Sequence, residues 1–428
     1  MRTALLVVVV VSGCVQREQA ASAPDGGTTA TSPDASPGTR SGTPDPSGDG
    51  DTVFATGDEP TNPFFASLGT NGRSCASCHD ANVGWTVTPQ ELAARFAQSD
   101  GTDPVFRPID GAVSPNADVS TSAARSTAYA LLLAKGVFRV GRPMPDGAEF
   151  ALIAVDDPYG YASASELSLF RRPMPSTNLA FDAAIMWDGR EPSLSQQAID
   201  ATLGHAQAMA APTEQVPQIV AFESSLFTAQ TYDNGAGDLR LAHGGPVALS
   251  TQPYTAGVTN PQATFMLYGA WQNDPNPRRA SIARGEVLFN THPFQIHGVG
   301  GMPDRQATCA TCHDTPNVGS HSSALALNIG ISDAMRRPPT LPLYTLQNLT
   351  TNATIQTSDP GLALTTGKWA DIGKFEVPSL RAVAMRAPYF HDGFAATLQD
   401  VVGFYDQRFG LHLSPSDRGD LVAFLSAL

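Results

Sequence analysis

The pentapeptide Cys-x-x-Cys-His occurs twice in this chain of 428 residues, as Cys75-Ala76-Ser77-Cys78-His79 and as Cys309-Ala310-Thr311-Cys312-His313. This spacing is the attachment signature of c-type haem, because two thiols add to the haem vinyl groups and the adjacent His supplies an axial nitrogen. With 5 Cys and 9 His, a chance match is expected in only about one in a thousand such chains. We therefore expect two covalently bound haems, with His79 and His313 as iron ligands.

A zinc knuckle, a redox dithiol and coincidence are the alternatives for the two motifs. A structural zinc site groups four ligands, usually with a second Cys-x-x-Cys pair nearby. The two pairs here lie far apart in the sequence, and each already ends in a His. Covalent haem is the interpretation that uses all six side chains.

Composition and charge limit the classes of function. Hydrophobic residues make up 42% of the chain and charged residues 15%, so a sizeable core is expected. The net charge of −14 argues against a nucleic-acid partner, since such proteins present basic surfaces. An acidic face is compatible with docking a basic electron carrier.

The first 14 residues have the pattern of an export signal. Met1-Arg2 precedes an apolar run from Ala4 to Val11, which is far shorter than the ~20 residues of a membrane-spanning helix. The sequence Val11-Ser12-Gly13-Cys14 resembles a bacterial lipobox, so we expect a lipoprotein-type signal over 1–14 and membrane contact only through lipid on Cys14. The alternative is an ordinary signal peptide that contains a Cys. Both predict a periplasmic protein.

Residues 15–52 are mostly Ser, Thr, Pro, Gly, Ala and Asp, which predicts a flexible tether. Two haem domains are expected after it, over 53–272 and 277–428. The fold class predicted is mainly α, with two cytochrome c-like haem domains face to face and a small β-hairpin insertion in the first. The hairpin is expected between 136 and 154, around Pro145-Asp146-Gly147. Periodicity predicts helices over 89–96, 194–207, 213–227, 279–289 and 416–428, the last capped by Ser414 or Ser416.

Two further stretches carry a specific resemblance. One is Met186-Trp187-Asp188-Gly189-Arg190-Glu191-Pro192-Ser193-Leu194-Ser195-Gln196-Gln197-Ala198, and the other is Phe375-Glu376-Val377-Pro378-Ser379-Leu380-Arg381 followed by Ala387-Pro388-Tyr389-Phe390-His391-Asp392-Gly393. With both haem motifs in order, the chain after Val53 resembles the bacterial di-haem cytochrome c peroxidase and MauG superfamily. Residues from about 100 to 165 are poorly covered and look like an insertion.

The resemblance implies that the first haem reacts with hydrogen peroxide, that the second supplies electrons, and that Trp187 lies between them. The alternative for Trp187 is a core aromatic.

Tyr405 is the most informative departure from the peroxidase branch of that superfamily. Those enzymes have a Met about 14 residues after the His matched by His391, as a ligand of the second haem. Counting from His391 reaches Tyr405, and MauG-like enzymes have an axial Tyr there. A phenolate favours ferric and higher states, whereas a thioether favours reduced iron. The alternatives are that Tyr405 only packs on the haem edge, or that Met385 is the ligand.

The peroxide side of the first haem departs from the family in two ways. No His follows His79 until His205, so the first iron is expected to be open at rest. The family's catalytic Glu lies about ten residues after the Gln matched by Gln197, and gapless counting places Gln207 there. His205 is the candidate proton shuttle; the alternatives are a ligand that closes the iron, or a core or surface His. The candidate catalytic residues are therefore His205, Gln197, Trp187 and Gln207.

Several cationic side chains are candidates for the haem periphery. Arg190, Arg381 and Arg386 suit haem propionates, since planar guanidinium groups pair with carboxylates; the alternative for each is ordinary surface charge. His391 is expected near the second haem. Members of the superfamily bind calcium through an Asn side chain and through carbonyls that include those matching Arg386 and Pro388. Arg172 replaces the Asn here, so calcium is doubtful and the guanidinium is expected to take its place.

These observations predict an exported di-haem oxidoreductase that reacts with hydrogen peroxide. It would be either a peroxidase that draws electrons from a small cytochrome c or a cupredoxin, or a MauG-like enzyme that oxidises a partner protein. Tyr405 and the open first haem favour the MauG-like route. A non-enzymatic electron-transfer or peroxide-sensing cytochrome is the alternative from another class.

Overall fold

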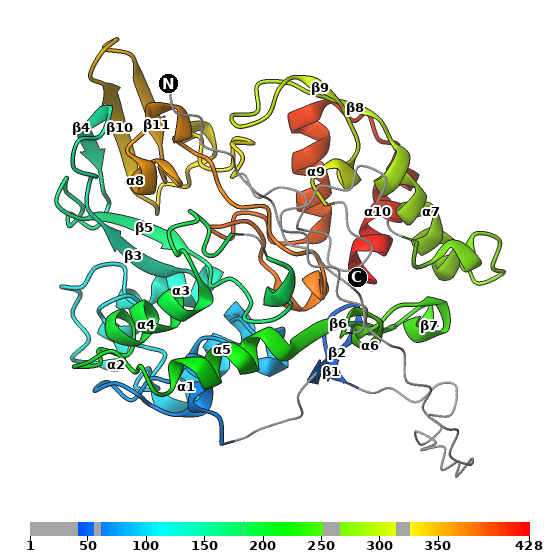
Figure 1. Cartoon of the computed structure of the whole chain (residues 1–428), viewed down its shortest axis with the longest axis horizontal. Coiled ribbons are helices and arrows are strands. Elements are labelled where there is room, and N and C mark those ends of the chain that lie inside the picture. The colour runs from blue at the N-terminus through cyan, green and yellow to red at the C-terminus, as the bar shows by residue number, and fades with distance from the viewer. Residues whose placement is uncertain (1–41, 55–60, 183, 251–265, 314–325) are drawn as a thin grey trace, which may run out of the picture. The chain divides into compact units, whose positions relative to one another are not determined.

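The computed structural model describes residues 42–54, 61–182, 184–250, 266–313 and 326–428. The part of the chain from Arg40 to Leu428 forms one compact unit, whereas the predicted signal and most of the predicted tether lie outside the described residues. Of the described residues, 35% are helical and 18% lie in strands or bridges (Figure 1). The prediction of a mainly α fold is therefore wrong, and the fold is mixed α/β, because strands between and around the haem motifs add several small sheets.

The helices predicted around the first motif are present. Thr88 caps helix α1 (Pro89–Ser99), which begins with a Pro in the first turn. Helix α4 (Leu194–Gly204) ends one residue before His205, and α5 (Val216–Ser225) leads directly into strand β6 (Leu226–Asp233). Shorter helices are α2 (Ser122–Ala128), α3 (Ala130–Lys135) and α6 (Pro246–Ser250).

Two helices predicted in the second region pack against each other. Helix α7 (Pro277–Thr291) lies against α10 (Pro415–Ser426), and Ser414 caps α10 through a capping box with Asp417. The close approach depends on Gly285, because a Cβ at that position would lie 1.9 Å from the carbonyl oxygen of Asp420. Helices α8 (Ala363–Thr366) and α9 (Leu398–Phe409) complete this region.

A four-stranded antiparallel sheet joins the end of the predicted tether to the first haem region. Its order is β1 (Thr43–Pro44), β2 (Gly48–Phe54), β6 and β7 (Gly237–Asp238). The last ten or so residues of the segment predicted as a tether are thus paired strands. Backbone nitrogen of Gln230 in β6 donates to the carbonyl of Leu428, so the end of the chain meets the same sheet.

The predicted β-hairpin is wrong in its pairing. Strands β3 (Phe138–Arg142) and β4 (Phe150–Asp156) flank the expected turn, but they do not pair with each other. Strand β3 pairs with β5 (Leu167–Arg171), which is buried along its whole length.

Strand β4 instead pairs with β10 (Leu343–Asn348), which also pairs with β11 (Thr354–Thr357); Figure 1 shows teal β4 beside brown β10 and β11. Burial of Phe150 with Tyr344 and Leu346 favours this long-range pairing over the local turn. The sheet therefore links the two regions predicted as separate haem domains. A short ribbon of β8 (Phe294–Ile296) and β9 (Arg305–Ala307) lies in the second region.

Within the described ranges, no helix has both the length and the apolar character that crossing a bilayer would require.

We predict that Gly285→Ala lowers the free energy of unfolding by about 1–3 kcal/mol, because the added methyl group meets the backbone of α10. Gly419→Ala in the same helix pair is the control, since a Cβ there meets nothing within 4 Å. It should be neutral or stabilise by about 0.5–1 kcal/mol. Chemical denaturation of the two haem-loaded variants measures both, and equal effects would contradict the close crossing.

Candidate functional site

The two Cys-x-x-Cys-His motifs adopt the same local structure. Each opens with a one-turn 3-10 helix, Cys75–Ser77 or Cys309–Thr311. A reciprocal capping box precedes each turn, formed by Ser74 with Ser77 and by Thr308 with Thr311. The backbone nitrogen of each His donates to the carbonyl of the first Cys, at 3.0 Å for His79 and 3.1 Å for His313.

The aromatic neighbours of the two His rings match as well. The ring of Phe64 lies 6.4 Å from that of His79 at an interplanar angle of 52°. The ring of Phe289 lies 6.3 Å from that of His313 at 53°. Two motifs more than two hundred residues apart therefore present the same imidazole packing.

The first motif borders two adjoining cavities that share Cys78, His79, Gln197 and His205. The one that Trp187 also borders is called the first cavity below, and Cys75 borders the other. Burial lowers the pKa of His79 to about 4, so its imidazole is neutral. The Nδ1 atom of His79 is 3.0 Å from the carbonyl oxygen of Trp85, an arrangement that leaves Nε2 available to a metal.

Trp85, whose carbonyl binds His79, is fixed by a contact with the N-terminal sheet. It is almost fully buried and adopts a positive φ of 62°, which is uncommon for a non-glycine residue. Its indole Nε1 donates to the hydroxyl of Thr52 in β2 at 2.9 Å. The strand that was expected to be part of a tether thus supports the carbonyl that orients His79.

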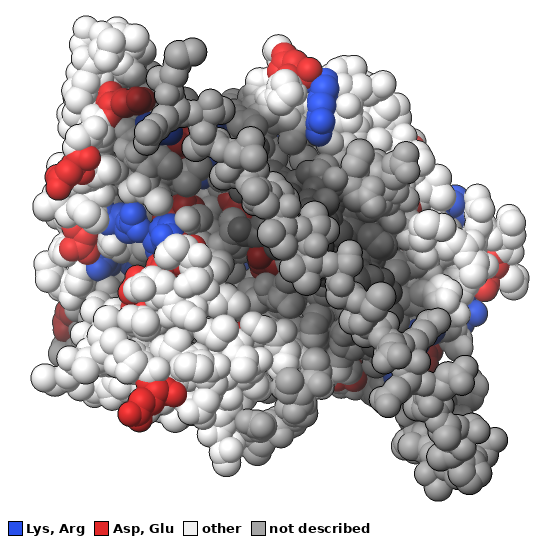
Figure 2. Space-filling model, in the orientation of Figure 1, with Lys and Arg blue, Asp and Glu red and all other residues white. Residues whose placement is uncertain are grey.

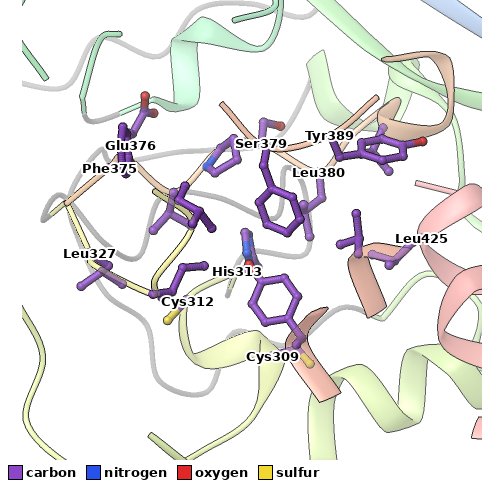
Figure 3. Close-up of a pocket in the computed structure, with 18 of the residues that line it drawn as sticks. Cys309, Cys312, His313, Leu327, Phe375, Glu376, Ser379, Leu380, Tyr389 and Leu425 are labelled. Carbon is purple, nitrogen blue, oxygen red and sulfur yellow. The ribbon is translucent and has the colours of Figure 1, made fainter. Parts of the chain in front are cut away.

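The second motif borders a separate, mainly apolar cavity (Figure 3). Figure 3 shows Cys309, Cys312 and His313 on one side of it, with Leu327, Leu380 and Leu425 among its other walls. Such walls suit the macrocycle of a haem, whose faces are apolar.

Tyr405 reaches this second cavity from helix α9. Its ring stacks on Phe409 at 6.1 Å, and burial together with the nearby thiols of Cys312 and Cys309 raises the pKa of Tyr405. A metal cation at this place would reverse that tendency and favour the phenolate. The rival Met385 packs against β2, since a Cβ on Gly50 would lie 2.1 Å from its sulfur.

Trp187 borders both the first and the second cavity. Its indole Nε1 donates to the carbonyl of Arg172 at 2.8 Å, and its ring lies 6.4 Å from that of His391. Met174 borders both cavities too. The indole therefore occupies the wall between the two predicted haem positions.

The residues predicted at the haem periphery differ in where they lie. Arg386 borders the second cavity, and its Nη1 is buried without a hydrogen-bond partner within the described structure. Arg190 borders the first cavity and pairs with Asp188 at 2.8 Å. Arg381 is buried next to Arg386, and Nη2 of Arg386 donates to the carbonyl of Arg381. Burial lowers the pKa of Arg381 to about 10. His391 is buried, stacks on Phe375 at 4.4 Å and leaves Nδ1 without a partner in the described part of the molecule.

These observations fit a c-type haem in each cavity. Both motifs place paired thiols beside an imidazole, and the imidazole of His79 is neutral. The second cavity has apolar walls, and the unpaired Nη1 of Arg386 there suits a propionate.

The predicted distal residues are only partly brought together. His205 and Gln197 border the first cavity, whereas Gln207 is exposed and binds Asn71 at 3.3 Å through its side-chain oxygen. The Nδ1 atom of His205 is 2.7 Å from Oδ2 of Asp110, a buried carboxylate outside every predicted motif. A lone Asp in the poorly covered segment has no spacing signal that could have found it.

Arg172 occupies a cage of backbone carbonyls. Its guanidinium donates to the carbonyls of Lys135 (2.7 Å), Val87 (2.7 Å) and Arg386 (3.2 Å). Burial lowers the pKa of Arg172 to about 9, which leaves it charged at neutral pH. The cage contains the carbonyl of Arg386, which the resemblance implies as a calcium ligand.

Comparisons with known proteins find relatives among di-haem peroxidases. A family model described as di-haem cytochrome c peroxidase matches residues 66–235. The chain is 26% identical over 285 residues to cytochrome-c peroxidase IdrP1 of Pseudomonas sp. (strain SCT), covering 60% of this chain and 68% of that protein. It is also 26% identical over 257 residues to cytochrome c551 peroxidase of Pseudomonas aeruginosa, covering 59% and 62%.

A third relative is the methylamine utilization protein MauG of Methylorubrum extorquens, 26% identical over 277 residues, with 60% of this chain and 64% of that protein covered. The matches thus span about two thirds of the length of these relatives. Among solved structures, a MauG-like protein associated with microbial copper homeostasis aligns over 86% of each chain, with a TM-score of 0.41 and 16% identity.

We predict that Glu223→Gln stabilises the protein more at pH 8 than at pH 4. Glu223 borders the first cavity, and burial raises the pKa of this carboxyl from about 4.5 to about 7. Between these values the folded state holds a proton that the unfolded chain releases. Stability is therefore fully present below about pH 4.5 and falls as the pH rises through about 7.

Thermal unfolding of wild type and variant at both pH values measures the difference. Glu214→Gln, a change at an exposed position just before the same helix, is the control and should show no such pH dependence. An equal shift in melting temperature at pH 4 and pH 8 would show that Glu223 does not titrate in this range.

Proposed function

Because this chain belongs to the superfamily of di-haem cytochrome c peroxidases and MauG, and is a peroxidase-type enzyme with two c-type haems, we propose that hydrogen peroxide reacts at the haem held by Cys75, Cys78 and His79. The neutral imidazole of His79, with Nδ1 held by a carbonyl, supports its role as the proximal ligand. No His lies between His79 and His205 in the sequence, which supports a first iron that is open to peroxide at rest.

The chain's own groups around peroxide are Gln197 and His205, which border the same cavity. Gln197 would donate a hydrogen bond to the bound oxygen. His205 would take the proton from the iron-side oxygen and return it to the departing one, which leaves as water. The haem supplies the electrons that this cleavage of the O–O bond requires. Gln207, exposed and bound to Asn71, has no part in this proposal.

Trp187 and Tyr405 would carry and store the oxidising equivalent. The single observation that carries this proposal is that Trp187 borders both cavities, so that one indole bridges the gap between the two macrocycles. Tyr405 borders the same cavity as His313 and would bind the iron of the second haem, where a phenolate would favour the oxidised state. With this ligand the oxidising equivalent would be stored in the protein and would not pass at once to a small reductant.

We therefore propose that the enzyme oxidises side chains of a partner protein, as the resemblance to MauG implies. The runner-up is reduction of peroxide with electrons from a small cytochrome c or a cupredoxin. The net charge of −14 is compatible with such a basic carrier. On the face shown in Figure 2, however, described acidic and basic side chains are scattered among uncharged ones, so this face offers little electrostatic steering.

The proposed location is the periplasm, because c-type haem attachment in bacteria takes place outside the cytoplasm. The apolar run before Cys14 supports export, and Cys14 would carry the lipid that anchors the chain. Release of the protein into the soluble periplasmic fraction by Cys14→Ser would test the anchor.

We predict that stoichiometric peroxide bleaches the Soret band of the diferric wild-type protein without prior reduction, and that the oxidised species persists for minutes in the absence of a donor. Tyr405→Met should shorten this lifetime by roughly tenfold or more and raise the midpoint potential of the second haem, because a thioether favours reduced iron. Stopped-flow spectra and a redox titration measure these quantities.

Tyr389→Phe is the matched control, since Tyr389 borders the same cavity while Figure 3 shows its hydroxyl directed away from His313. It should leave both quantities unchanged. A reaction that starts only after one haem is reduced would favour the electron-fed peroxidase. No reaction in either state would leave electron transfer as the function.

We further propose that Arg172 replaces calcium between the haems. Its guanidinium satisfies the carbonyls of Lys135, Val87 and Arg386 that a metal ion would otherwise bind. Chelators should therefore leave the melting temperature and the spectra of the wild type unchanged.

Arg172→Asn should lower the melting temperature by several degrees, because buried carbonyls lose their donors. Millimolar calcium should restore part of the loss, whereas magnesium, which is smaller and holds its water more tightly, should restore less. Thermal scans of the variant with each ion measure the rescue, and loss of the wild-type haem spectrum on chelation would contradict the proposal.

A further inference from the structure

The ion pair between Arg73 and Asp110 lies beside the first cavity and outside the sequence motifs described above. Asp110 borders this cavity and is 4% exposed; Arg73, two residues before Cys75, is 2% exposed. Oδ2 of Asp110 lies 2.6 Å from Nη1 of Arg73 and 2.7 Å from Nδ1 of His205. Arg73 and His205 therefore both bind the same oxygen atom of Asp110, and the three residues come from three separate segments.

The backbone holds this meeting point in place. Arg73 donates through Nε to the carbonyl of Pro104 (2.8 Å) and through Nη2 to that of Val105 (2.6 Å). Its Nη1 also lies 3.3 Å from the carbonyl of His205. The backbone nitrogen of Arg139 donates to the carbonyl of Asp110 at 2.6 Å. Arg73 thus ties the segment from 104 to 110, and the start of the loop after α4, to the first haem motif.

The charges decide which nitrogen of His205 carries the proton. Burial alone would raise the pKa of Asp110, but the charge of Arg73 and the bond to His205 outweigh it and hold that pKa below its usual value. An ionised carboxylate can only accept hydrogen bonds, so Nδ1 of His205 must be the donor. Nε2 of the neutral ring then carries the free lone pair.

We propose that Asp110 and Arg73 are positioning residues that fix the ring and tautomer of His205 for proton transfer to and from peroxide. The inference rests on the proposed function and goes beyond it by naming what replaces the family's missing carboxylate. Nε2 takes the proton of the iron-side oxygen and delivers it to the departing oxygen, which leaves as water; the haem supplies the two electrons. Asp110, from the segment between the first haem motif and strand β3, would therefore contribute to chemistry at the first haem.

A double-mutant cycle on the haem-loaded protein tests this coupling. His205→Ala should slow the reaction of the diferric protein with peroxide by about 100-fold or more. Asp110→Ala should slow it by about 10-fold or more, because the ring of His205 loses the group that fixes its orientation and tautomer. In the His205→Ala background, Asp110→Ala should add nothing, because its target is absent. A further tenfold loss in the double variant would overturn the proposal.

A spectroscopic measurement tests the position of His205 without turnover. The C–O stretching frequency of carbon monoxide on the reduced first haem responds to the electrostatic field of a group beside the ligand, here the lone pair on Nε2 of His205. His205→Ala and Asp110→Ala should shift this band in the same direction, and the double variant should match His205→Ala. An Asp110→Ala band identical to that of the wild type would overturn the proposal even if the wild type proved unreactive toward peroxide.

Two further variants guard against misfolding. Asp110→Asn keeps an acceptor for Arg73 and for Nδ1 but loses the charge, so it should fold and show an intermediate effect on both rate and band. Glu166→Gln is the matched control, because Glu166 pairs at 2.7 Å with Arg139, which supports the same segment without touching His205. It should change neither quantity; a change equal to that of Asp110→Asn would show that only the fold of the segment matters.

Discussion

A seam of hydrogen bonds around Trp187 is the constraint on which the di-haem arrangement depends. The indole donates to the carbonyl of Arg172, and the carbonyl of Trp187 accepts from the backbone of Glu376 at 2.9 Å. The backbone of Arg172 donates in turn to the carbonyl of His391 at 2.6 Å. Segments that carry the first motif's region and the second motif's region are thereby joined at the wall that separates the two cavities. The pairing of β4 with β10 reinforces this junction.

Much of the local structure could be predicted from the sequence, because the signals are themselves local. Haem turns, the cap at Ser414 and the existence of helices α7 and α10 depend on neighbouring residues. Strand partners do not. The turn at Pro145-Asp146-Gly147 favours a hairpin, but β3 pairs with β5 and β4 with β10, and Phe150 of β4 is buried in one cluster with Tyr344 and Leu346 of β10. The fold class was wrong for the same reason.

The candidate site shows a similar division. His79, His313 and Trp187, which motif spacing singles out, border the cavities, and so does Tyr405, which counting from a motif singles out. Asp110 and Glu223 could not, since each becomes part of the first cavity only through tertiary packing. Gln207, chosen by gapless counting, is exposed because α4 ends at Gly204 and the backbone of Gln207 turns into the left-handed region.

The hydrogen bond from the indole of Trp187 to an amide carbonyl also determines how that side chain can be oxidised. An amide oxygen is far too weak a base to remove the indole proton, so loss of an electron would leave a protonated, positively charged ring. The electron can then return without waiting for a proton to come back. Electron exchange between the two cavities through Trp187 would accordingly be insensitive to solvent deuteration, because no proton transfer would limit its rate.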